Sequence, residues 1–237
     1  MFGRMPKMTI GRVSQIPVRL DITFLIVPYL LFSALSGRPV GEHWQQMAAV
    51  TVGVFLSIFL HELGHALTAR LYSVRVAEIV VGGFYGYASM KKMAVTRLRA
   101  MAILAAGPAA NLVIFGILWL ALSTPSFAEL TPRGLRWPAG GNLEWLAETL
   151  RLMAFLNLLM FAFNLLPVFP LDGGKLFGLV LNRFYTAVTS VRVVSWLSIV
   201  FGAIMALYGF GSSIFMVFIG AMIVTTNLSR LRLTKAR

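Results

Sequence analysis

The chain has 237 residues, of which 58% are hydrophobic and only 12% are charged. Soluble domains are about 45–50% apolar and about 25% charged, so this composition excludes a soluble, secreted or disordered protein and predicts several membrane spans. Lysine and arginine outnumber aspartate and glutamate by 21 to 8. In a soluble protein this excess would suggest nucleic acid, but in a membrane protein it is typical of basic cytoplasmic loops. We therefore expect a lipid bilayer and no nucleic acid as partner.

Apolar stretches in the sequence predict six transmembrane helices. A helix needs about 20 apolar residues to cross a hydrocarbon core of about 30 Å. The last stretch is too long for one span and is broken by Gly209-Phe210-Gly211, which predicts a hairpin of two helices. The stretches cover residues 22–36, 44–72, 98–122, 143–166 and 191–228, and the last of them supplies the hairpin.

The basic residues lie mainly on one side of these six spans. An even number of spans puts both termini on the same side of the membrane. Of the 21 basic residues, 17 lie in the terminal segments or in the loops after the second and fourth spans. Because cytoplasmic loops carry the excess of lysine and arginine, we expect both termini in the cytoplasm.

The loop between the second and third spans predicts a small β-hairpin within residues 74–93. Its first half is rich in β-branched residues, Gly82-Gly83 follow as a turn, and aromatic residues come next. Two interpretations remain open for this strand pair. It is either a structural hairpin or a surface that pairs with an unwound substrate segment through main-chain hydrogen bonds.

The second span contains the sequence His61-Glu62-Leu63-Gly64-His65. Two histidines four residues apart share one face of a helix and can bind one Zn²⁺, while the glutamate between them can serve as general base. The chain has no cysteine and only three histidines, so a transition-metal site must use histidine and carboxylate. The alternative is a polar cluster that lines a water-filled cavity or joins helices by hydrogen bonds.

A catalytic zinc usually takes a third protein ligand and keeps one position open. His43 lies 18 residues before His61, about 27 Å along a helix, and is excluded unless the helix breaks. Asp172 follows the proline-interrupted end of the fourth span, which reaches the same depth and side as the histidine pair. Asp172 is therefore the expected third ligand. The alternative is an N-cap on a following short helix.

Three motifs together resemble the site-2 protease family of intramembrane zinc metalloproteases. They are the HELGH sequence in an early span, Gly107-Pro108 with Asn111 in the third span, and the Asn164-to-Gly174 segment that contains Asp172. The resemblance implies that His61, His65 and Asp172 hold one Zn²⁺ per chain, that Glu62 is the catalytic acid and base, and that Asn164 helps to hold substrate. It also implies a three-helix catalytic core and a substrate that is a membrane protein with a transmembrane helix.

The resulting expectation is an α-helical polytopic membrane protease, with about six transmembrane helices around that core and a small sheet between spans two and three. Residues 1–237 would form one membrane-embedded domain, with a catalytic core at about 44–175 and the helical hairpin at about 191–228. We expect the minimal form of the family, without PDZ or CBS domains, in a prokaryotic cell membrane. The alternatives are another membrane zinc hydrolase, of the prenyl-protein protease type, and a non-catalytic membrane adaptor. The oligomeric state is not predicted.

Overall fold

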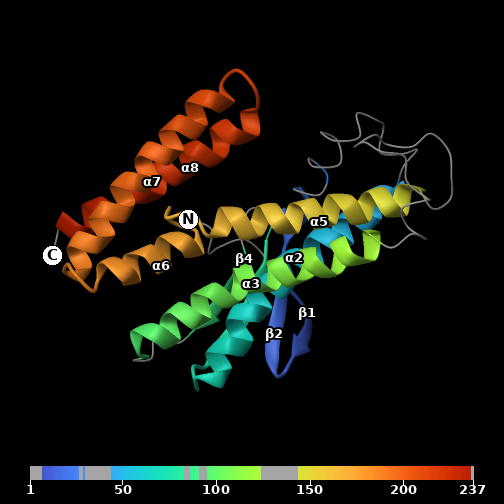
Figure 1. Cartoon of the computed structure of the whole chain (residues 1–237), viewed down its shortest axis with the longest axis horizontal. Helices are drawn as coiled ribbons and strands as arrows, with labels where there is room; N and C mark the ends of the chain where they lie inside the picture. Colours follow the sequence, from blue (N-terminus) through green and yellow to red (C-terminus); the bar gives the residue numbers. More distant parts are fainter. Residues whose placement is uncertain are drawn as a thin grey trace. The chain divides into compact units, whose positions relative to one another are not determined.

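The computed structural model describes residues 7–26, 29, 44–82, 86–90, 95–123 and 144–235 (Figure 1). Five of the described helices are long and apolar enough to cross a membrane, and they correspond to the second to sixth predicted spans. The predicted first span, residues 22–36, lies mostly outside the described residues, and its start is a short 3-10 helix, η2 (Ile22–Leu25). The five long helices are α2 (Trp44–Leu71), α3 (Arg97–Leu122), α5 (Glu144–Asn164), α7 (Ala187–Gly209) and α8 (Ile214–Lys235).

The chain divides into two compact units. The first comprises residues 1–95 and 109–161, and the second comprises residues 96–108 and 162–237. The first unit therefore contains a small sheet, α2 and most of α3 and α5. The second unit contains α6 (Asp172–Leu181), α7 and α8. The boundary runs through α3 and α5, so it does not follow the ends of secondary structure.

Helix α2 buries one narrow stripe of its surface. The buried side chains recur every three or four residues, which is the spacing of one face of an α-helix. The exposed positions of α2 are also apolar, as Val52 at 57% and Leu56 at 45% exposure show, and apolar residues on every side are typical of a helix that meets lipid. The stripe consists of Gln46, Val50, Val54, Ser57, His61, His65 and Ala69, and it widens to include Glu62 and Ala66 beside the histidines.

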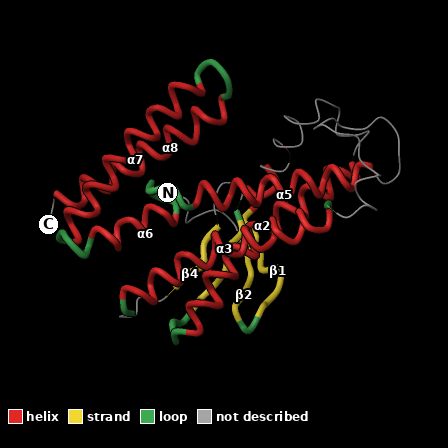
Figure 2. The backbone as a smooth tube through the Cα atoms, in the orientation of Figure 1, coloured by secondary structure: helices red, strands yellow, loops and turns green. Residues whose placement is uncertain are grey.

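A four-stranded sheet packs against α2, with strand order β1-β2-β3-β4. The predicted hairpin is present as β3 (Val76–Val81) and β4 (Gly86–Met90), which pair antiparallel. Two further strands, β1 (Lys7–Val13) and β2 (Ile16–Asp21), were not predicted from the N-terminal segment. Because β2 pairs with β3 in parallel, β3 is a central strand, and β4 is an edge of the described sheet (Figure 2).

The turn between β1 and β2 explains how this segment forms a hairpin. Ser14 and Gln15 both have positive φ, at 52° and 68°, and the flanking residues Val13 and Ile16 are paired. Positive φ at both central residues is the geometry of a type I′ turn, whose twist matches that of the strands. The sequence lacks the Asn-Gly or Asp-Gly signal that usually marks this turn.

One face of the sheet is apolar and belongs to the buried core, whereas the other carries a cluster of polar side chains. Ile16, Ile79 and Val81 belong to the buried core that includes Val50 and Val54 of α2.

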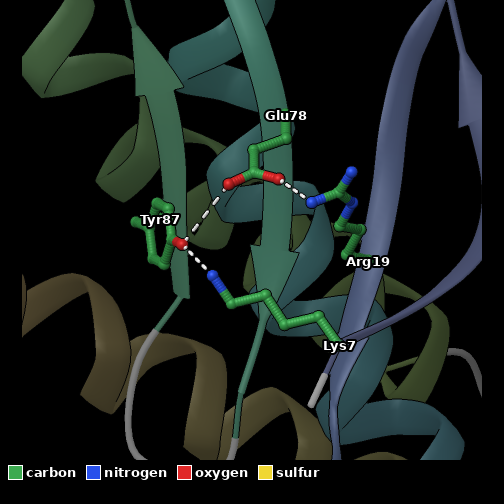
Figure 3. Close-up of polar contacts among 4 residues, drawn as sticks. All are labelled: Lys7, Arg19, Glu78 and Tyr87. Carbon is green, nitrogen blue, oxygen red and sulfur yellow. Dashed lines mark hydrogen bonds and ion pairs between the residues drawn. The ribbon is translucent and has the colours of Figure 1, made fainter. Parts of the chain in front are cut away.

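A polar cluster of Lys7, Arg19, Glu78 and Tyr87, with one residue from each strand, lies in front of the strands in Figure 3, with α2 behind them. Arg19 forms an ion pair of 2.8 Å with Glu78, and Lys7 donates a 2.6 Å hydrogen bond to the Tyr87 hydroxyl. This bond to Tyr87 raises the pKa of Lys7 above its usual value. The cluster links all four strands across the polar face.

The second unit is built around the α7–α8 helical hairpin (Figure 1). Helix α7 ends at Gly209 and α8 begins at Ile214, so the chain turns at the predicted Gly-Phe-Gly break. The two helices approach closely at Gly202 and Gly220, because a Cβ added to Gly202 would lie 2.8 Å from the Gly220 carbonyl oxygen. Small residues at helix contacts of this kind are typical of membrane proteins.

Candidate metal centre

The candidate centre begins with three buried polar residues on one turn and a half of α2. His61, Glu62 and His65 are only 5%, 6% and 6% exposed. The Nε2 atoms of His61 and His65 lie 3.2 Å apart, with the two rings perpendicular to each other at 85°. Helix geometry places residues i and i+4 on one face, and here it makes the two nitrogens converge.

The histidine pair fits a tetrahedral zinc ion. Zinc binds imidazole nitrogen at about 2.0–2.1 Å in tetrahedral geometry, which requires two ligand nitrogens to lie about 3.3 Å apart. The observed separation of 3.2 Å agrees with this value. A hydrogen bond between one protonated and one unprotonated ring nitrogen would give the same separation, so the distance is compatible with a metal ion without requiring one.

The second ring nitrogen of His61 contacts a buried amide. Its Nδ1 lies 2.5 Å from Oδ1 of Asn111 on α3, and Asn111 in turn bonds Asn157 on α5. Asparagines inside apolar helices are often interhelical hydrogen-bond partners rather than site residues. These two do join the three helices, but Asn111 also contacts the ring of a candidate ligand. Only the position of Asn111, three residues after Gly107-Pro108, distinguished it in the sequence.

Glu62 packs against the start of β4. A Cβ added to Gly86 would lie 2.7 Å from Oε1 and 2.9 Å from Cγ of Glu62. Real Cβ atoms do not approach other atoms this closely, so glycine is the residue that lets the strand lie against this carboxylate. The sheet therefore borders the HELGH motif directly.

Asp172 lies in the first turn of α6 in the second unit and is 5% exposed. The N-cap of α6 is Leu171, so the alternative in which Asp172 is the N-cap of a short helix does not hold. Lys175 contacts the carboxylate at 2.8 Å from the next turn. An acidic residue in the first turn also suits the positive end of the helix dipole.

The two glycines after Asp172 hold the start of α6 against the preceding loop. A Cβ on Gly173 would overlap the backbone of Leu165 and Leu166, and one on Gly174 would lie 2.5 Å from the Val168 carbonyl carbon. Any larger residue at these positions would push the helix start away from the loop. The Asp-Gly-Gly sequence therefore determines where the carboxylate is held within this unit.

The loop before Asp172 is also held by the α7–α8 hairpin. The Ser198 hydroxyl accepts a 2.8 Å hydrogen bond from the Phe169 amide, and the Asn227 side chain donates a 3.0 Å bond to the Phe169 carbonyl. The Arg230 guanidinium lies 4.7 Å from the centre of the Phe169 ring. Both backbone groups of Phe169 are thus satisfied by side chains, which orders an otherwise irregular segment next to the candidate ligand.

His61, His65 and Asp172 form one group of potential ligands. All three are buried, and together they could hold a metal ion. Asn164, the expected substrate-binding residue, ends α5 and is partly buried. His43, which was excluded as a ligand, lies outside the described residues.

Comparison with known families gives an independent result. Residues 49–132 and 140–208 match the family described as peptidase family M50. This match covers the HELGH motif, Asn111, Asn164 and Asp172, and it favours this family over the prenyl-protein protease type considered as an alternative.

Individual relatives support the same assignment. The chain is 28% identical over 198 residues to a zinc metalloprotease of Methanocaldococcus jannaschii, covering 84% of this chain and 52% of the relative. It is 29% identical over 157 residues to stage IV sporulation protein FB of Bacillus subtilis, covering 66% of this chain and 46% of that protein. The chain therefore spans about half the length of these curated relatives.

A solved structure shows the same fold. The site-2 protease from Methanocaldococcus jannaschii superimposes with a TM-score of 0.66 at 24% sequence identity, with 95% of each chain covered. With the five apolar helices, these matches identify an integral membrane protein.

Proposed function

The chain belongs to peptidase family M50, and we propose that it is a zinc-dependent endopeptidase that cleaves a transmembrane segment of a membrane protein near the cytoplasmic side. The observation that carries the proposal is the buried group of His61, His65 and Asp172, which could hold a metal ion next to an intact Glu62. Placing ionisable groups inside a membrane helix is energetically unfavourable, and a metal-dependent reaction explains why they are kept there.

Three residues are proposed as ligands of one zinc ion. His61 and His65 would bind through Nε2, and Asp172 through a carboxylate oxygen. Zinc with three protein ligands and one open position supplies Lewis acidity, which lowers the pKa of a water molecule and polarises a carbonyl group. The Asp-Gly-Gly turn and the bonds to Phe169 keep the carboxylate in place.

Glu62 is proposed as the acid and base of the reaction. Its carboxylate would accept a proton from the attacking water and later deliver it to the amine of the leaving segment. Its burial at 6% exposure and its packing against Gly86 limit the positions that the carboxylate can take. Asn164 is proposed to hold substrate by hydrogen bonds from its side-chain amide.

The edge strand β4 is proposed to bind the unwound substrate. The carbonyl groups of a helix are bonded internally, so the substrate must unwind before cleavage. An extended segment could then add to an exposed strand through main-chain hydrogen bonds. β4 is suited to this because it is an edge of the described sheet and starts against Glu62.

The absence of native cysteine allows a direct test of strand addition. We expect Ser89→Cys on β4 to form disulfides with a substrate that carries one cysteine near its cleavage site. Thr9→Cys on β1 is the matched control at the other edge of the sheet. Equal crosslinking from both positions, or none from Ser89→Cys with a substrate that is cleaved, would contradict strand addition.

The enzyme activity itself is tested with Glu62→Gln. We expect the purified variant to retain about one zinc per chain and to lose cleavage, because the amide cannot accept the proton. Membrane fragments that accumulate only in cells with the active enzyme would identify the substrate. Cleavage by Glu62→Gln at the normal rate, or wild-type protein that binds no zinc, would refute the proposal.

The orientation is also proposed from the sequence. With both termini in the cytoplasm of a prokaryotic cell, the α7–α8 turn faces outward and the α6–α7 connection faces inward. Ser212→Cys should then react with a membrane-impermeant maleimide in intact cells, whereas Tyr185→Cys should react only after lysis. The reverse labelling pattern would overturn this topology.

The whole chain is proposed to act as one membrane-embedded protease domain, with the catalytic core at about 44–175 and the hairpin at about 191–228.

A further inference from the structure

The buried amides behind His61 determine which ring nitrogen carries the proton. We propose that Asn111 and Asn157 are positioning residues that hold His61 in the tautomer protonated on Nδ1, so that Nε2 is the unprotonated nitrogen that a metal ion requires. The inference rests on the proposed function because it treats His61 as a ligand. The tautomer itself is a property of the metal-free chain and can be measured separately.

The positioning residues form a continuous chain of hydrogen bonds. Asn111 Nδ2 donates to Asn157 Oδ1 at 2.8 Å. Asn157 Nδ2 donates to the Ser57 hydroxyl and to the Met153 carbonyl, both at 2.8 Å. The Ser57 hydroxyl donates to the Gly53 carbonyl at 2.8 Å. We call Ser57, Asn111 and Asn157 the amide relay.

Backbone carbonyls set the direction of the relay. The Met153 carbonyl can only accept, so the atom of Asn157 beside it must be the NH₂ group. The other side-chain atom of Asn157 is then its oxygen, which accepts from Asn111. The Asn111 NH₂ group is also 3.4 Å from the Ser57 carbonyl, another group that only accepts. Both contacts therefore assign the orientation of the Asn111 amide.

The consequence for His61 follows directly. With its NH₂ group directed at Asn157, Asn111 presents Oδ1 to Nδ1 of His61 at 2.5 Å. A carbonyl oxygen can only accept, so Nδ1 must carry the proton. In the neutral ring Nε2 is then unprotonated, and Nε2 is the atom that faces His65 at 3.2 Å. A main-chain carbonyl on α5 thus selects the metal-binding form of a histidine on α2.

Because these residues are buried, each amide has one favourable orientation. Asn111 and Asn157 are fully buried at 0% exposure and Ser57 is 4% exposed, so water does not compete for these groups. Reversing either amide would set two acceptors or two donors against each other, and leaving a buried polar group without a hydrogen bond is unfavourable. Partners of this kind orient a ligating histidine and increase its basicity.

The tautomer can be read by NMR on full-length, metal-free protein with ¹⁵N-labelled histidine. The chain has only three histidines, and His61→Gln assigns the signals of His61. At a pH where the ring is neutral, we expect a protonated Nδ1 and an unprotonated Nε2 in the wild type. In Asn111→Leu this preference should be lost. A wild-type His61 ring protonated on Nε2 would overturn the inference.

Zinc affinity, measured by competition with a chelating dye, gives the second readout. Asn111→Leu should bind zinc about 10- to 100-fold more weakly, as is typical when such a partner is lost. Asn111→Asp keeps an acceptor for Nδ1 but sets a second acceptor against Asn157 Oδ1, so it should lose stability and still bind zinc more tightly than Asn111→Leu. Thr149→Val removes a buried hydroxyl from the same helix as Asn157, where it donates to the Trp145 carbonyl at 2.8 Å, and should leave the zinc affinity unchanged.

The outcomes separate this inference from the proposed function. If wild-type protein binds zinc and Asn111→Leu binds it equally well, the positioning role is refuted and the function stands. If Asn111→Asp and Thr149→Val weaken zinc binding as much as Asn111→Leu, the amide relay acts only on stability, which also refutes the role. If wild-type protein binds no zinc, the proposed function fails, whereas the NMR result still decides the tautomer.

Discussion

Gly86→Ala should impair cleavage without removing the metal. The added Cβ would lie 2.7 Å from Oε1 of Glu62 and 2.9 Å from Cγ2 of Ile58. Ordinary contact begins at 3.4 Å, so the carboxylate must move by at least 0.7 Å or the start of β4 must shift by as much. The three atoms nearest to the new methyl group belong to Glu62 and Ile58, not to either histidine.

The size of the effect follows from this displacement. A misplacement of about 1 Å at a reacting group can cost about 100-fold in rate. We therefore expect cleavage by Gly86→Ala to fall by about 10- to 100-fold, together with a loss of about 1–3 kcal/mol of stability from overpacking. Zinc content should stay near one per chain, because His61, His65 and Asp172 are unchanged.

The assay compares initial cleavage rates in detergent micelles or liposomes, with zinc content and thermal unfolding measured on the same samples. Gly11→Ala is the matched control, because nothing lies within 4 Å of a Cβ added at that strand position. The control should cleave at the wild-type rate. Wild-type cleavage by Gly86→Ala, at normal zinc content, would refute the claim that β4 confines Glu62.

Three further variants test the ligand set and the second unit. Asp172→Ala should lose tight zinc binding, and retention of the ion in a dialysis assay would argue against ligation. Asn227→Leu removes the hydrogen bond to the Phe169 carbonyl. Because this bond orders the loop before Asp172, its loss should weaken zinc affinity several-fold. An unchanged dissociation constant for zinc would show that the hairpin does not hold this loop. Gly202→Ala should destabilise the α7–α8 hairpin by about 1–3 kcal/mol in thermal unfolding. Gly211→Ala should not, because no described atom lies within 4 Å of a Cβ added there. Equal melting temperatures of the two variants would disprove close packing at Gly202.

The helices and the histidine pair could be predicted because they depend on local sequence. A span is a run of apolar residues whose backbone must be satisfied internally in lipid, so composition alone locates it. The HELGH motif likewise needs only the periodicity of one helix to bring His61 and His65 together. Asp172 was predicted as the third ligand because few acidic residues lie near the end of a span.

The sheet shows where local patterns were insufficient. β3 and β4 were predicted from β-branched and aromatic residues around a glycine turn, but β1 and β2 were not. Their hairpin uses Ser14 and Gln15 in left-handed conformations, which no turn motif announces. Parallel pairing of β2 with β3 joins residues about 60 positions apart, and such pairing depends on the whole fold.

The sequence by itself determined the membrane class, the family motifs and the residues that carry the proposed chemistry, because each follows from composition or from spacing within one helix. Only the tertiary structure decided what surrounds them. It brought Gly86 against Glu62, and it placed Asn111 and Asn157, 50 and 100 residues from their partners on α2, behind His61. Hydrogen bonds over such separations exist only after the helices pack, so they leave no periodic pattern in the sequence.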